Sequence, residues 1–171
     1  NKSNLERSDS VLKGLKYLEQ VKKIPSDSWV MVHDAARPCV SKTDIDSLLA
    51  LRSLDSVGGI LGAPVRDTMK RSVKKTDIDT NEAIHNVSLT ETRESLWHAL
   101  TPQLFRLGEL SKALLQCELQ SMTVTDECSA MENIGETPHI VEGSHNNIKV
   151  TYPSDLELAA FLIEKNKETE R

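Results

Sequence analysis

Nine polar residues of this chain occupy positions that a hydrophobic core does not explain. They lie at the ends of predicted strands or the starts of predicted helices, and they are Asp34, Arg37, Arg66, Thr68, Lys70, Arg93, Thr101, Thr125 and Lys149. Arginine forms planar, bidentate hydrogen bonds to phosphate oxygens, and lysine adds a compact positive charge. Threonine hydroxyls and the amides of helix N-termini are neutral donors. This combination predicts a site for a phosphorylated, hydroxylated ligand.

Asp34 supplies the carboxylate of this set. Mg²⁺ usually binds one or two carboxylates together with phosphate oxygens of the substrate. Asp34 is therefore the candidate ligand for a divalent metal, and Mg²⁺ is the expected cofactor. The histidines and cysteines lack the spacing of metal ligands, and no serine–histidine–aspartate order or cysteine–histidine pair favours a hydrolase.

Several of these residues also have a purely structural explanation. Thr125 is as well suited to capping a helix as to binding phosphate, and Thr101 lies where a helix could begin. Lys70 is more simply explained as part of a solvated face. Arg93 stands among glutamates, where a surface ion pair would contribute little. Asp34 could cap the turn that follows it.

The segment V-H-D-A-A-R-P at 32–38 is central to the pattern. It follows Trp29–Val32, an unalternating apolar run that predicts a fully buried strand. Charged side chains directly after a buried parallel strand lie at the carboxyl edge of the sheet, where open α/β sheets bind their ligands. Ser41 and Asp44 then resemble a capping box, with aspartate in place of glutamate, and predict the start of a helix. The glycine-rich run 58–65 predicts a second buried strand, and thus a βαβ unit in a parallel sheet.

The remaining elements follow from periodicity and from helix start and stop signals. Apolar residues at helical spacing predict a helix over 8–23. Pro102 predicts the start of a helix that runs to about Leu119, and Thr125 the start of another that ends at Gly135. Short strands are expected at 139–141 and 147–151. A final helix from Ser154 should bury its apolar residues, which are Leu156, Leu158, Ala159, Phe161, Leu162 and Ile163.

Residues 66–92 are polar and strongly charged. Two weakly alternating strands around a charged turn at 72–82 predict a hairpin arm. A polar arm of two strands is too weak to fold alone and commonly packs on a partner. We therefore expect a homodimer formed through this arm.

Composition excludes some classes of function. A chain of 171 residues predicts one domain, and the net charge of −5 argues against non-specific binding of nucleic acid. No apolar run approaches the roughly 20 residues that span a bilayer, so no membrane partner is expected. The three cysteines, an odd number, favour free thiols and a cytoplasmic location.

Six stretches together resemble the 2-C-methyl-D-erythritol 4-phosphate cytidylyltransferase family. They occur in the family's order and span nearly the whole chain. They are E-R-S-D-S-V-L-K-G-L at 6–15, V-H-D-A-A-R-P at 32–38, A-P-V-R-D-T-M-K at 63–70, L-W-H-A-L-T-P-Q at 96–103, T-D-E-C-S-A at 125–130 and N-I-K-V-T-Y-P-S-D-L at 147–156. No single stretch is specific, but the combination is.

The resemblance implies an α/β fold of the Rossmann-like nucleotidyltransferase type: a three-layer sandwich with a mostly parallel sheet, in a single domain over 1–171 with a projecting β-arm at about 66–92. It also implies an activity. Members of the family join CTP to methylerythritol phosphate with Mg²⁺, giving 4-diphosphocytidyl-2-C-methyl-D-erythritol and pyrophosphate for isoprenoid precursors. The substrate phosphate attacks the α-phosphorus, so catalysis is positioning and neutralisation of charge.

The same resemblance assigns roles to individual residues. Asp34, Arg37 and Lys149 match catalytic positions and, with Thr101 and Thr125, would hold the methylerythritol phosphate. Thr68 and Arg93 match arm residues that reach into the partner subunit's site. Ser10 matches a position near the cytosine of CTP.

One departure from the family is large. In the family, a first strand and a glycine-rich loop that carries arginine and lysine bind the CTP triphosphate, and three strands of the fold precede the stretch at 6–15. These 171 residues hold no counterpart of that loop. We therefore expect the N-terminal strands to be missing from this chain, an upstream segment in the native gene, and little or no activity from the chain alone.

Two other functions compete with this interpretation. Ribitol 5-phosphate-type cytidylyltransferases share the fold and the region around 34–38, although the run at 96–102 and Arg93 favour the methylerythritol substrate. A non-catalytic binding module that lost its nucleotide loop is the second alternative.

Overall fold

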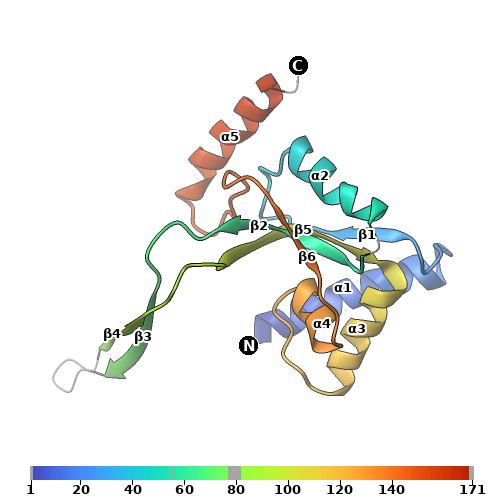
Figure 1. Ribbon diagram of the computed structural model, residues 1–171, viewed down its shortest axis with the longest axis horizontal. Helices are drawn as coiled ribbons and strands as arrows, with labels where there is room; N and C mark the ends of the chain where they lie inside the picture. The colour runs from blue at the N-terminus through green and yellow to red at the C-terminus, as the bar shows by residue number, and fades with distance from the viewer. Residues whose placement is uncertain (1, 55, 77–81, 170–171) are drawn as a thin grey trace. The chain divides into compact units, whose positions relative to one another are not determined.

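The computed structural model describes residues 2–54, 56–76 and 82–169 (Figure 1). The chain divides into two compact units. One unit comprises Asn1–Gly62 with Ala99–Arg171, and the other comprises Ala63–His98.

The sheet of the first unit has the strand order β1-β5-β2-β6. These strands are β1 (Trp29–Val32), β5 (Trp97–Arg106), β2 (Gly58–Pro64) and β6 (His139–Glu142). β1 pairs with β5 antiparallel, whereas β2 and β6 are parallel. The sheet is therefore mixed, and β5 separates the two strands of the expected βαβ unit.

Helices cover both faces of this sheet, which gives the expected α/β arrangement of three layers (Figure 1). On one face lie α1 (Lys2–Gln20), α3 (Leu107–Leu119) and α4 (Glu127–Asn133). On the other lie α2 (Lys42–Leu49), continued by the 3-10 turn η1 (Ala50–Ser53), and α5 (Asp155–Thr169). The larger core forms on the first face, where Leu12 and Leu15 of α1 pack with Phe105 and with the buried side of α3.

Strand β2 depends on glycine at two positions. A Cβ atom at Gly58 would lie 2.1 Å from the carbonyl oxygen of Leu104 in β5, and Gly58 has a φ of +116°. A Cβ atom at Gly59 would lie 2.3 Å from the carbonyl oxygen of His139 in β6. These two glycines thus permit close backbone approach on both sides of the strand.

The prediction of a helix starting at Pro102 is wrong. Pro102 lies inside β5, and α3 begins only at Leu107. The spacing of the leucines between 104 and 115 is compatible with a strand or with a helix. All six residues from Leu100 to Phe105 are buried in the sheet. Burial between two neighbouring strands, which periodicity does not report, outweighs the helix signal of the proline.

Three other expectations need correction. The residues of β1 are only partly buried, because this strand pairs with β5 alone among the described strands. Residues 147–151 form no strand, although the amide of Val150 bonds to the carbonyl of Ala36. Helix α5 buries Ala159 and Leu162 as expected, whereas Leu156, Leu158 and Phe161, which were also expected in the core, are exposed.

The predicted start is correct for two helices and differs from the observed start for two others. Ser41 and Asp44 form the predicted capping box of α2, and α5 begins directly after Ser154. The first helix begins at Lys2 instead of Ser8. The N-cap of α4 is Asp126, not Thr125, since the Asp126 side chain accepts the amide of Ser129.

The second unit holds the pair of polar strands predicted for the arm. β3 (Lys70–Thr76) pairs antiparallel with β4 (Ala83–Thr90), with an irregularity between Arg71 and Ser72. Every residue of both strands is exposed. The predicted turn at 72–82 overlaps β3, and its residues 77–81 lie outside the described residues.

Candidate functional site

The Asp34 carboxylate is the centre of a charged cluster in the first unit. Its Oδ1 atom accepts a hydrogen bond from Nε of Arg7 at 3.2 Å, and its Oδ2 atom accepts one from Nζ of Lys149 at 3.1 Å. Burial of this carboxyl group favours its neutral form, but the hydrogen bonds and charges of Lys149 and Arg7 outweigh burial and lower its pKa. Asp34 is therefore ionised at neutral pH and pairs with two cations.

Arg7 and Glu127 belong to this cluster, although neither was among the predicted site residues. The Nη1 and Nη2 atoms of Arg7, on α1, donate to the two carboxylate oxygens of Glu127 at 2.8 and 2.9 Å. Glu127 is only 1% exposed. Burial would lower the pKa of Arg7, but its bonds to Glu127 and Asp34 raise it. Both residues lie in stretches that carry the family resemblance, yet periodicity alone offers no signal that they meet across 120 positions.

Thr101 joins the cluster through the backbone of Asp34. Its buried hydroxyl accepts the Asp34 amide at 3.0 Å and lies 3.0 Å from Nδ1 of His33. The other ring nitrogen of His33 lies 3.0 Å from the Arg37 carbonyl oxygen. An Nε2–H tautomer of His33 satisfies both contacts, because Nε2 then donates to Arg37 and Nδ1 accepts from Thr101.

The Arg37 side chain is partly buried and bonds to the protein backbone. Its Nη1 donates to the carbonyl oxygen of Asn147 at 2.8 Å, and the Asn147 side chain donates to the carbonyl of Thr101 at 2.8 Å. Burial lowers the pKa of Arg37, and the charge of Asp34 opposes this shift only in part. Nε of Arg37 and Oδ1 of Asn147 are buried and have no hydrogen-bond partner in the described part of the chain. Arg37 thus connects the 32–38 segment to the segment that carries Lys149.

Thr125 lies beside the cluster at the start of α4, two residues before Glu127. Its exposed hydroxyl contacts Ser129 at 3.3 Å. The adjacent Asp126 caps the helix and accepts from the buried Gln103 of β5 at 2.9 Å. Because Asp126 does the capping, the hydroxyl of Thr125 is not needed for the helix start.

Four predicted residues therefore belong to one cluster: Lys149 pairs with the Asp34 carboxylate, Thr101 bonds to the Asp34 amide, and the Arg37 guanidinium feels the Asp34 charge. Ser10 lies on the same helix as Arg7, one turn further along. Thr68 and Arg93 belong to the second unit, where both are exposed.

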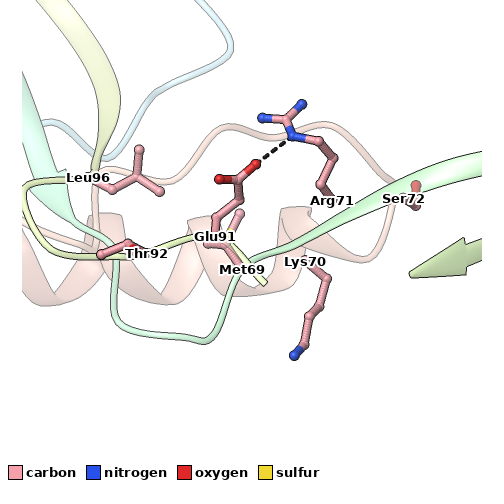
Figure 2. A pocket seen from close by; sticks show the side chains of 7 residues that line it. All are labelled: Met69, Lys70, Arg71, Ser72, Glu91, Thr92 and Leu96. Carbon is pink, nitrogen blue, oxygen red and sulfur yellow. Dashed lines mark hydrogen bonds and ion pairs between the residues drawn. The ribbon is translucent and has the colours of Figure 1, made fainter. Parts of the chain in front are cut away.

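Thr68 lies just before β3 and Arg93 lies just after β4. Arg93 donates from Nη1 to the carbonyl oxygen of Arg66. Next to them, a shallow pocket is lined by Met69, Lys70, Arg71, Ser72, Glu91, Thr92 and Leu96. In Figure 2 the Arg71 guanidinium points to the Glu91 carboxylate, with which it forms an ion pair, and the Lys70 ammonium points away from it. Lys70 instead donates to Thr90 at 2.6 Å, in keeping with a solvated face.

The described residues do not fit a metal ion held by protein ligands alone. They contain no group of three histidine, cysteine, aspartate or glutamate side chains arranged to bind one. Both oxygens of Asp34 are already engaged by cations. The assignment of Asp34 as a metal ligand gains no support from this geometry. The three cysteines are buried and free.

The chain is similar to proteins of one family. A family model described as 2-C-methyl-D-erythritol 4-phosphate cytidylyltransferase matches residues 3–165. The protein of that name from Vibrio parahaemolyticus is 50% identical over 162 residues, which cover 95% of this chain and 64% of the relative. The chain thus spans less than two thirds of that relative's length.

Solved structures give the same result. The crystal structure of the Francisella tularensis enzyme of that name superimposes with a TM-score of 0.75 at 39% identity, covering 91% of this chain and 67% of that one. A crystal structure of a 4-diphosphocytidyl-2C-methyl-D-erythritol synthase superimposes with a TM-score of 0.76 at 33% identity, covering 92% and 67%.

Proposed function

The chain belongs to the 2-C-methyl-D-erythritol 4-phosphate cytidylyltransferase family, and we propose that its charged cluster binds the phosphorylated acceptor of that reaction. In this proposal, CTP and methylerythritol phosphate give 4-diphosphocytidyl-2-C-methyl-D-erythritol and pyrophosphate, a step in isoprenoid precursor biosynthesis. The relatives named above are methylerythritol phosphate enzymes, so the ribitol 5-phosphate alternative is not favoured.

The arrangement around Asp34 is the observation that carries the proposal. Arg7, Arg37 and Lys149 contribute three positive charges, and Asp34 and Glu127 contribute two negative ones. One positive charge remains to attract an anionic ligand. The Lys149 side chain is 50% exposed and can turn toward a phosphate, whereas the exposed Thr125 hydroxyl can donate a neutral hydrogen bond.

The residues act by positioning in the proposed reaction. An acceptor phosphate oxygen attacks the α-phosphorus of CTP, and pyrophosphate leaves, so no side chain needs to act as a nucleophile. Lys149 and Arg37 neutralise charge on the acceptor, and Asp34 orients its hydroxyl groups. Thr101 holds the Asp34 backbone in place. Ser10 contacts the nucleotide, and Thr68 and Arg93 contribute from the second unit of a partner subunit.

Magnesium, dimerisation and location are further parts of the proposal. Mg²⁺ would be held chiefly by the phosphates of the substrates, since the described residues offer no complete set of ligands. A homodimer through residues 66–92 is supported by exposed apolar side chains on both strands, among them Val73, Ile84 and Val87. A cytoplasmic location agrees with three free thiols. None of the described helices has the length and apolar character needed to cross a membrane.

Calorimetric titration tests the function. Binding is measured first, because the chain spans 64% of its Vibrio parahaemolyticus relative. We expect methylerythritol phosphate to bind more tightly than ribitol 5-phosphate, and Asp34→Asn to weaken the binding. Asp46→Asn is the matched control, since Asp46 pairs with Lys42 on the surface of α2. Pyrophosphate release with CTP and Mg²⁺ is then assayed with both sugar phosphates.

Two results would contradict this proposal. A chain that binds neither sugar phosphate has no acceptor site, and a preference for ribitol 5-phosphate assigns the site to the other substrate. Sedimentation velocity tests the dimer separately: a monomer at all accessible concentrations would exclude it.

A further inference from the structure

All three nitrogen atoms of the Arg7 guanidinium donate hydrogen bonds to carboxylates of the protein. Its Nε bonds to Asp34, and its Nη1 and Nη2 bond to Glu127. A guanidinium has five N–H groups in a rigid fork. With both terminal nitrogens engaged on one carboxylate and Nε on another, Arg7 is poorly placed to grip a phosphate in bidentate fashion.

Glu127 fixes the orientation of that guanidinium. The carboxylate is 1% exposed, and it sits in the first turn of α4. Helix α4 is itself tied to β5, because Gln103 donates to Asp126 at 2.9 Å and accepts the amide of Cys128 at 2.9 Å. Bidentate arginine–carboxylate pairs hold a defined geometry. The guanidinium of Arg7 is thereby held in one orientation by a rigid element.

We propose that Arg7 is a positioning residue, which Glu127 anchors and which holds Oδ1 of Asp34 so that Oδ2 stays with Lys149. The consequence for the acceptor site rests on the function proposed above. Arg7 fixes the Asp34 carboxylate before the acceptor arrives, and the Asp34–Lys149 pair then presents a preformed surface to it. Preorganised groups bind a ligand without a further ordering cost.

Glu127→Gln separates positioning from a simple effect of charge. Glutamine keeps the shape of the side chain but removes a negative charge and one acceptor of the fork. If charge alone mattered, the site would become more positive, and an anionic phosphate would bind more tightly. If Arg7 positions Asp34, the freed guanidinium releases the carboxylate, and methylerythritol phosphate binds more weakly. We expect weaker binding by about tenfold, the low end for losing a supporting partner of a site.

Nuclear magnetic resonance of the Arg7 side chain provides a measurement that does not depend on the function. In the wild-type chain, we expect the Nε–H proton of Arg7 to exchange slowly with water, because it is bonded to Asp34. Exchange should accelerate in Glu127→Gln and in Asp34→Ala, which removes the acceptor of the Nε–H bond. Lys13→Gln is the matched control: Lys13 lies on the same helix and pairs with Asp9 at the surface, so it should alter neither the exchange nor the binding.

Arg7→Lys and a double variant complete the design. Lysine keeps the charge but cannot bond to both carboxylates as the fork does, so binding should weaken as in Glu127→Gln. If a single variant does not fold, the double variant Arg7→Met/Glu127→Met is measured in its place, because the double variant leaves no unpaired charge buried. Unchanged or tighter binding of methylerythritol phosphate by these variants overturns the proposal.

Failure of the function would be recognised separately. If the wild-type chain binds no methylerythritol phosphate, the proposed function is wrong. The exchange rate of the Nε–H proton then tests, without any binding measurement, whether Arg7 positions Asp34. Exchange as fast in the wild-type chain as in Asp34→Ala would then overturn the positioning role, and slower exchange would support it.

Discussion

The Oδ2 atom of Asp34 lies 3.1 Å from the Nζ atom of Lys149, although 115 positions separate the two residues. Asp34 follows β1, whereas Lys149 lies in the segment between β6 and α5. The amide of Val150 bonds to the carbonyl of Ala36 at 2.8 Å, which places the two segments side by side. A backbone contact next to the ion pair therefore sets its position.

Lys149→Met should weaken the binding of methylerythritol phosphate without unfolding the chain. The lysine is 50% exposed, so its ion pair contributes only about 0–1 kcal/mol to stability. Loss of its charge should nevertheless reduce phosphate affinity, measured by calorimetry. Lys42→Met is the control, because it removes a surface ion pair of α2 outside the cluster. Equal losses of affinity in both variants would argue against a specific role of Lys149.

Asp34 should make the chain sensitive to acid. Its pKa is lowered in the folded state, so its ion pairs stabilise the fold fully above the unfolded pKa of about 3.9. This stabilisation is lost as pH falls through the lower, folded pKa. Urea unfolding should therefore show a free energy that falls more steeply between about pH 5 and pH 2 for the wild-type chain than for Asp34→Asn. If the free energy of unfolding fell equally with pH in the wild-type chain and in Asp34→Asn, the result would contradict the lowered pKa of Asp34.

Gly58→Ala should destabilise the sheet strongly. The new Cβ atom would meet the Leu104 carbonyl oxygen at 2.1 Å, and the φ of +116° is strained for any residue with a side chain. We expect a loss of more than about 3 kcal/mol in the free energy of unfolding. Gly14→Ala is the matched control: Gly14 lies in α1 with open space around it, and alanine there should stabilise by about 1 kcal/mol. Similar effects at both glycines would refute the steric argument.

Thr125 and Asp126 should separate binding from helix capping. Asp126→Ala removes the N-cap of α4 and should cost about 0.5–2 kcal/mol. Thr125→Val should leave stability nearly unchanged but weaken phosphate binding, since it removes a hydroxyl donor. Thermal unfolding and calorimetry of both variants measure the two effects. A large loss of stability in Thr125→Val would show that its hydroxyl is structural.

Much of the fold was predictable because the signals that define it are local. The capping box of Ser41 and Asp44, the apolar run of β1 and the glycines of β2 each involve residues that are close in the chain. Six short stretches, none of them specific alone, were together sufficient to indicate the family. They also placed Asp34 and Lys149 among the predicted site residues.

Partners far apart in the chain were not predictable in the same way. Pro102 carries a helix-start signal and lies in a strand, because burial between neighbouring strands outweighs local preference. Arg7 and Glu127 look like ordinary charged residues near two helix starts, yet they form a partly buried ion pair, and Arg7 also bonds to Asp34. Residue order and periodicity establish which side chains can carry charge and which face the core. Only the packing of α1 and α4 against the sheet determines which charges meet, because a pair separated by 120 positions leaves no trace in local pattern.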